Sequence, residues 1–297
     1  MQHTFSPTLE RVLAAEPPTL LFHYTSPAGL IGITKEKQVW ATNIRYMNDA
    51  KEVGHAVDYA KHLLQNFLRE IPQLTEEEKE LFKEMHGYAG AAARRIYLFS
   101  LTEERDLLSQ WRAYCPPGGG YAIGFPSQQL RVMAEKQGFF LCPCVYDHYT
   151  QCAIIREIVE GYITHYRAQR EAGVDISEAR QRTAWEFGQH IVRYGPVLKH
   201  PSFREEKEWR LISGIISETH LQIDYRAGAA GISPFFRFNL VDDEHPNLKV
   251  DGVHTVVITG PCNDYEAAQM AVQFLCTTYL GEGVVGFGRS SAPYRTW

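Results

Sequence analysis

The chain has 297 residues, 44% of them hydrophobic and 22% charged, a composition typical of a globular protein with a core of its own. The formal net charge of -5 excludes a protein that coats nucleic acid through a basic surface. No run approaches the ~18 apolar residues of a membrane span, no signal peptide opens the chain, and six scattered cysteines form no disulfide framework. We therefore expect a cytoplasmic protein with no membrane partner.

Strands and helices alternate irregularly in the first half of the chain. After a polar lead-in over residues 1–18, the pattern predicts strands at 20–24, 38–41, 96–100, 121–125 and 139–146, and helices at 28–36, 50–69, 75–95 and 106–114. Asn48 and Asp49 are suitable caps for the helix over 50–69. Thr75 and Glu78 have the spacing of a capping box, which places a helix start between them.

The second half is predicted to begin with a helical hairpin over about 150–193, broken near Gly173–Asp175. Strands are then expected at 207–216, 235–238, 255–258 and 284–287, with a helix at 264–279. Because the elements never settle into repeating βαβ units, the order favours an α+β fold. One domain over residues 1–297, with a helical insertion at about 148–198, is the simplest organisation.

The segment Glu206–Arg210 is the first candidate for chemistry. In a strand, Glu206, Glu208 and Arg210 share one face, with the two carboxylates about 7 Å apart. Their repulsion at that distance, roughly 2.4 kcal/mol, would hold one carboxylate protonated or poised near neutrality, and Arg210 would offset part of the shift. An edge strand with solvated charges is the alternative, but the strand continues into apolar Leu211.

A second candidate strand carries His23, Tyr24 and Thr25. His23 and Thr25 share a face, and both can donate and accept hydrogen bonds, which suits recognition of a sugar hydroxyl. Tyr24 points the other way or stacks on a flat ring. The alternative is that His23 is a satisfied core histidine.

Arg112 lies in a predicted helix and either binds phosphate bidentately or pairs with a surface glutamate. Two further patterns give competing hypotheses. Glu205 and Lys207 fit an E-x-K nuclease motif with Glu206 between them, but residues 176–204 lack the aspartate that such nucleases need. A zinc site is conceivable from the spacing of four residues, although structural zinc sites usually have other spacings: Cys142, Cys144, His148 and Cys152.

Several segments together resemble the domain-of-unknown-function family 2971 (DUF2971), a bacterial group that includes abortive-infection proteins of the AbiGi type. The resemblance extends from about residue 20 to 295, and its most specific parts are the W-R-A-Y segment and F-x-x-E-x-E-W-R. The matching segments are FHYTS, VWATNIRYMNDAKE, YLFSLTEERDLLSQWRAY, YAIGF, FREEKEWRLI and the closing SSAPYR.

This family resembles the ADP-ribosyltransferase fold, in which a split β core clamps NAD. The resemblance implies that His23 and Thr25 bind NAD, that Glu208 is the catalytic carboxylate and that Glu206 orients the acceptor. It also implies a nicotinamide-stacking residue, either Tyr46 or Trp40. Ser100, within the segment 99–102, would take the place of the family's central Ser-Thr-Ser motif.

The resemblance thus predicts an enzyme that uses NAD as a substrate and needs no metal. It would be a phage-defence or toxin-type effector that modifies a protein or nucleic acid, with a phage trigger or an antitoxin as a possible partner. The alternative is a non-catalytic sensor module that binds a nucleotide or nucleic acid.

Overall fold

The computed structural model describes residues 4–47, 58–59, 61–62, 64–66, 69, 74–88, 95–116, 119–228, 231–246, 248–250 and 252–292. Its strands form a mixed, mostly antiparallel sheet in the order β11-β10-β4-β1-β3-β2-β8-β7, with β6 paired to β3 and β5 paired to β6. The strands are β1 (Leu20–Thr25), β2 (Gln38–Asn43), β3 (Tyr97–Thr102), β4 (Tyr121–Pro126), β5 (Phe139–Pro143), β6 (Glu208–Ser213), β7 (Ile223–Gly228), β8 (Gly231–Asn239), β9 (Lys249–Val250), β10 (Val253–Thr259) and β11 (Val285–Arg289).

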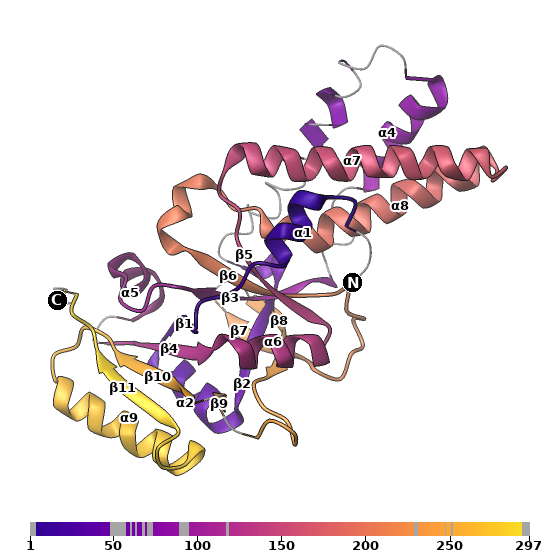
Figure 1. Cartoon of the computed structure of the whole chain (residues 1–297). Coiled ribbons are helices and arrows are strands. Elements are labelled where there is room, and N and C mark those ends of the chain that lie inside the picture. Colours follow the sequence, from indigo (N-terminus) through magenta and orange to yellow (C-terminus); the bar gives the residue numbers. More distant parts are fainter. Residues whose placement is uncertain are drawn as a thin grey trace.

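Helices cover both faces of this sheet (Figure 1). They are α1 (Pro7–Leu13), α2 (Pro27–Glu36), α4 (Glu76–Tyr88), α5 (Leu108–Tyr114), α6 (Ser127–Lys136), α7 (His148–Glu171), α8 (Ile176–Tyr194) and α9 (Tyr265–Leu280), with short 3-10 turns η1 (Ile44–Tyr46), η3 (Gly195–Val197) and η4 (Pro201–Glu206). No helix in the described part of the chain is both long and apolar enough to cross a membrane. The α+β prediction is confirmed.

Strand alternation sends successive side chains of the central strands into two separate cores. Leu98 and Ile212 face a core built with α1, α4, α7 and α8. Phe99 and Leu211 face the opposite core, which includes side chains of α2, α6 and α9. The helices of the first group lie above the sheet in Figure 1, and α2 and α9 lie below it.

The face of β3 and β6 that begins with Leu98 and Ile212 changes character along the strands. The register pairs Leu98 with Ile212, then Ser100 with Arg210, then Thr102 with Glu208. The face is therefore apolar beneath the helical hairpin and charged at its far end.

The sheet divides along one edge of β3. β2 pairs with β3 at Tyr97 and Leu98, whereas β1 pairs with it at Thr102. β1 and β2 therefore diverge on either side of Ser100, in the middle of β3. The ring of His23 on β1 reaches this gap, and its Nδ1 lies 3.0 Å from the carbonyl oxygen of Ser100.

Local signals predicted most of the elements. The capping box at α4 is confirmed, because Thr75 N donates to Glu78 Oε2 and Glu78 N donates to Thr75 Oγ1. The helical hairpin is present as α7 and α8. The predicted caps Asn48 and Asp49, most of the helix over 50–69, the end of the helix over 75–95 and the end of the SSAPYR segment lie outside the described residues.

Other elements differ from the prediction. The lead-in contains α1, which begins at the cap Ser6, and α6 follows β4 with no side-chain cap hydrogen bond at Pro126. β7 was not predicted, and it pairs with β8. β5 ends at Pro143, not at Tyr146, and β6 begins at Glu208, so that Glu206 lies in η4 and outside the strand.

Asp106, just before α5, joins that helix to the segment after β11. Its Oδ1 accepts hydrogen bonds from Trp111 Nε1 at 2.7 Å and Ser290 Oγ at 2.5 Å, and its Oδ2 accepts from the backbone and hydroxyl of Ser291. Burial alone would raise the pKa of Asp106, but these hydrogen bonds lower it. Two segments that carry the family motifs are thereby fixed to each other.

We expect Asp106→Asn to lower the free energy of unfolding by about 1–3 kcal/mol at pH 7, because one carboxylate oxygen that accepts two hydrogen bonds is replaced by a donor. A depressed folded-state pKa stabilises the protein above the unfolded pKa. The difference between wild type and variant should therefore shrink as the pH falls through the folded pKa of Asp106. Urea unfolding at several pH values measures this. Asp243→Asn, at an exposed position, is the control that should change little.

Candidate functional site

Two adjoining cavities open at the place where β1 and β2 diverge. The larger has a volume of about 540 Å³ and the smaller about 50 Å³. Four residues line both of them: His23, Tyr24, Ser100 and Tyr114. The two cavities are therefore parts of one site that are separated by the side chains at the divergence.

His23 has a defined protonation state in this site. Burial lowers the pKa of its ring to about 4, although the hydrogen bond with Ser100 acts in the opposite direction. The ring is therefore neutral at pH 7. Because a carbonyl oxygen only accepts, Nδ1 must carry the proton that it donates to Ser100, which leaves Nε2 as an acceptor.

The larger cavity combines aromatic, small and cationic groups. Trp40 and Tyr46 line it and are each about half exposed. The ring of Trp40 stacks on Phe235 with centroids 4.4 Å apart, and the guanidinium of Arg226 lies 5.9 Å from the centroid of Trp40. Arg226 also donates to Thr42 Oγ1 at 3.0 Å. The start of α2 forms another wall, so the cavity offers stacking surfaces together with a positive group.

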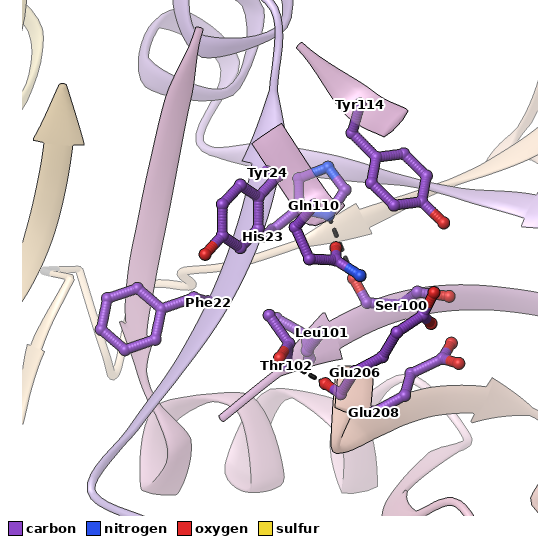
Figure 2. Close-up of a pocket in the computed structure, with 10 residues that line it drawn as sticks. All are labelled: Phe22, His23, Tyr24, Ser100, Leu101, Thr102, Gln110, Tyr114, Glu206 and Glu208. Atoms are coloured by element: carbon purple, nitrogen blue, oxygen red, sulfur yellow. Dashed lines mark hydrogen bonds between the residues drawn. The ribbon is translucent and has the colours of Figure 1, made fainter. Parts of the chain in front are cut away.

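The smaller cavity is lined by polar groups from β1, β3, α5, η4 and β6 (Figure 2). Its members beyond the shared four are Phe22, Leu101, Thr102, Gln110, Glu206 and Glu208. Figure 2 shows the two glutamate side chains on one side of it and Gln110 reaching in from α5. Thr102 Oγ1 donates to the backbone oxygen of Glu206 at 2.5 Å and so attaches η4 to β3.

Glu208 lies between two buried cations. Arg210 Nε donates to its Oε1 at 2.7 Å, and Arg210 Nη2 donates to Oε2 at 3.0 Å. Lys199 Nζ donates to the same Oε2 and also to Glu206 Oε2, the latter at 2.7 Å. Both cations are only 2% exposed. The four charges sum to zero, which is the condition under which such a group can be removed from water.

Lys199 is held in place through its backbone. Its amide donates to Val145 O at 3.0 Å, and its carbonyl accepts from Gln151 Nε2 at 2.8 Å. The ammonium lies 4.8 Å from the ring centroid of Phe203, a cation–π contact. The segment that follows α8 is thereby fixed against the end of the sheet.

From the sequence, one of the two carboxylates was expected to be protonated or to have a pKa near neutral pH. Glu208 is not such a carboxylate. Burial opposes ionisation, but the guanidinium of Arg210 and the ammonium of Lys199 hold the pKa of Glu208 down to about 2. The prediction considered only the repulsion by Glu206. Because Lys199 donates to both carboxylates, it replaces that repulsion with two attractions.

The structure brings most of the predicted site residues together. His23, Tyr24, Ser100, Glu206 and Glu208 line the smaller cavity. The larger cavity adds Thr25 and both candidates for the stacking residue, Tyr46 and Trp40. Arg112 lies apart from this group: it is exposed on α5 and is not among the residues that line either cavity.

The sequence interpretation missed two contributors. Lys199 follows apolar Val197 and Leu198, and a lone lysine directly after an apolar run is the signal that could have drawn attention to it. Gln110 was not among the candidate residues, but it is 7% exposed and lines the smaller cavity.

The zinc hypothesis gains no support from the described residues. Burial raises the pKa of Cys142 to about 12 and holds that of Cys144 well above its usual value, which disfavours the thiolate that zinc requires. The group with suitable metal-ligand spacing in the described part is another one, Asp242 with Glu244 and His245. Its two carboxylates already contact the ammonium of Lys136.

Fold and site together define an α+β protein in which a cavity lined by two glutamates opens where a mostly antiparallel sheet divides. Residues 110–211, from α5 into β6, match the model of the family described as a protein of unknown function (DUF2971), which supports the predicted resemblance to that family over this part of the chain. The matched segment contains Gln110, Lys199 and both glutamates. No curated protein and no solved structure matches the chain.

Replacing Lys199 by methionine should lower the free energy of unfolding by about 3–5 kcal/mol, because two carboxylates lose a buried partner. Chemical denaturation measures this difference. Lys207→Met is the matched control: Lys207 pairs with Glu104 on the surface, where solvent screens the charges, and its loss should change stability little. Equal effects of the two substitutions would contradict the importance of the buried network.

The low pKa of Glu208 predicts a specific acid response. Its folded pKa of about 2 is below the usual 4.5, so the ionised carboxylate stabilises the fold above pH 4.5 and that contribution is lost as the pH falls towards 2. In Glu208→Gln, this part of the pH dependence should be absent. Unfolding curves between pH 7 and 2.5 would show the two proteins converging in stability, and parallel curves would argue against the assignment.

Proposed function

We propose that this chain is an NAD-dependent enzyme of the ADP-ribosyltransferase type, which binds NAD across the two cavities and modifies a macromolecular acceptor. One observation carries the proposal: two glutamates, of which Glu208 is ionised, and a neutral histidine from a distant part of the sequence line one small cavity beside a larger one with aromatic walls. NAD has ribose hydroxyls that suit the smaller cavity, and flat rings and phosphates that suit the larger one.

The charge of Glu208 supports this reaction class. Cleavage of the bond between nicotinamide and ribose develops positive charge on the sugar, and a fixed carboxylate stabilises such charge. With a pKa of about 2, Glu208 is ionised throughout the physiological range. Glu206 is the more exposed of the two, with 15% of its side chain accessible, and is the better placed to orient an acceptor.

The larger cavity is suited to the remainder of NAD. Trp40 and Tyr46 provide surfaces on which a flat ring can stack. Arg226 provides a positive group for the diphosphate. His23, at the junction of the cavities, is able to accept a hydrogen bond from a ribose hydroxyl through Nε2.

The proposal predicts that the purified protein releases nicotinamide from NAD, and that Glu206→Gln and Glu208→Gln lower the rate by at least about 100-fold, by analogy with the loss of one preorganised charge-stabilising group. Glu205→Gln is the matched control, because Glu205 is exposed and is not among the residues that line either cavity. Chromatographic detection of nicotinamide gives the rate, with the wild type incubated with cell lysate as a source of acceptor.

Because Glu208→Gln also removes an ion-pair partner, its melting temperature is measured in the same samples. Glu206→Gln retains the contacts between Glu208 and Arg210, so full activity in this folded variant would contradict the role given to Glu206. Wild-type protein that does not bind NAD in calorimetry would contradict the proposal as a whole.

One observation favours a second candidate, a sensor that binds the nucleotide without cleaving it. Both carboxylate oxygens of Glu208 already accept hydrogen bonds from Arg210 or Lys199, an arrangement that also fits a rigid recognition site. NAD binding without nicotinamide release, in the presence of lysate, would favour the sensor over the enzyme.

A further inference from the structure

Gln110 is a buried amide that other parts of the site leave unexplained. It lies in α5, is 7% exposed and lines the smaller cavity. Among the described residues, no protein group forms a hydrogen bond with its side chain, whereas the amide nitrogens of the buried Gln129, Gln151 and Gln169 each donate at least one. Figure 2 shows its amide end directed towards Ser100 and the glutamates.

The side chain of Gln110 is largely covered, but its amide atoms remain accessible from the smaller cavity, so a methionine of similar length should be tolerated there if the position is purely structural. An amide that is open to a cavity and forms no hydrogen bond with the protein is available to bind a ligand in that cavity. The cavity into which Gln110 points therefore indicates what that ligand group is.

The volume of the smaller cavity restricts that group. An aromatic ring of benzene size occupies a cavity of about 150 Å³. The smaller cavity has about 50 Å³ and so cannot enclose a nicotinamide or purine ring, whereas the adjoining cavity of about 540 Å³ can. The group beside Gln110 must be small, such as the hydroxyls at the edge of a sugar.

The lining of the cavity restricts the group further. Glu206 and Glu208 only accept hydrogen bonds, and His23 has an acceptor at Nε2, so the ligand has to bring donors. The carboxylates also disfavour a phosphate. Gln110 adds one acceptor and two donors, a combination that matches neighbouring hydroxyls, since each hydroxyl donates once and accepts as well.

We propose that Gln110 recognises the ribose of the bound dinucleotide, with its carboxamide forming hydrogen bonds to the 2′- or 3′-hydroxyl of the nicotinamide ribose. Gln110 is then the residue that selects this sugar, while the larger cavity accommodates the rings and phosphates. The inference rests on the proposed function, since it takes NAD as the ligand, but it assigns a separate role to a separate residue.

The test compares Gln110→Met with Gln129→Met. Gln129 in α6 is also buried, at 2% exposed, but its Nε2 donates to Leu240 O at 2.8 Å and it is not among the residues that line either cavity, so it is a structural glutamine. Gln110→Met should keep or raise the melting temperature and weaken NAD binding about tenfold in calorimetry. Gln129→Met should lower the melting temperature and leave the affinity for NAD unchanged.

Two NAD analogues, lacking the 2′- or the 3′-hydroxyl of the nicotinamide ribose, locate the contact. If Gln110 binds a hydroxyl, Gln110→Met should weaken the analogue that lacks this hydroxyl less than twofold. A full tenfold loss for both analogues would overturn the inference, as would an unchanged affinity of Gln110→Met for NAD or a loss of stability equal to that of Gln129→Met. Failure of the wild type to bind NAD would overturn the proposed function together with it.

Discussion

The ionised side chain of Glu208, held between Lys199 and Arg210, is the interaction on which the site depends. Each of these groups would be strongly destabilising if it were buried alone, and only their mutual contacts make their burial possible. Arg210 Nη1 also donates to Pro196 O at 2.7 Å. The network thereby ties the segment after the helical hairpin to the end of β6. The wall of the smaller cavity and the attachment of the hairpin are consequences of the same contacts.

The division of the sheet has a comparable double role. Where two strands leave a third, a backbone carbonyl loses its usual partner, and a buried carbonyl without a hydrogen bond is costly. The ring of His23 fills this position at Ser100 and at the same time borders both cavities. The hydrogen bond that stabilises the divergence also fixes which ring nitrogen carries the proton. His23 thus stabilises the fold and sets the hydrogen-bonding groups of the site through the same hydrogen bond.

Much of this architecture could be read from local patterns, because those patterns have local causes. Thr75 and Glu78 predicted a helix start through contacts three residues apart. By contrast, α6 has no side-chain cap from which its start could be predicted. β7 pairs with β8 alone among the described strands, and its polar residues, such as Asp224 and Arg226, do not show the pattern of a buried strand. Long-range contacts were the least predictable. The charge state of Glu208 depends on where Lys199 lies, and the environment of Gln110 depends on strands that enclose it from three parts of the chain. Sequence could therefore identify His23 and Glu208 as candidates but could not determine their protonation.

Those protonation states restrict the chemistry that the site can support. A general acid or base works best when its pKa is close to the working pH. Glu208 and His23, with pKa values of about 2 and 4, are both well below neutrality, so one is a permanent anion and the other a permanent neutral acceptor. Neither is suited to protonating a leaving group. A substrate whose leaving group departs without protonation is therefore the best match for this pair. Nicotinamide in NAD is such a leaving group, because its ring nitrogen carries the positive charge before the bond breaks and becomes neutral as it leaves.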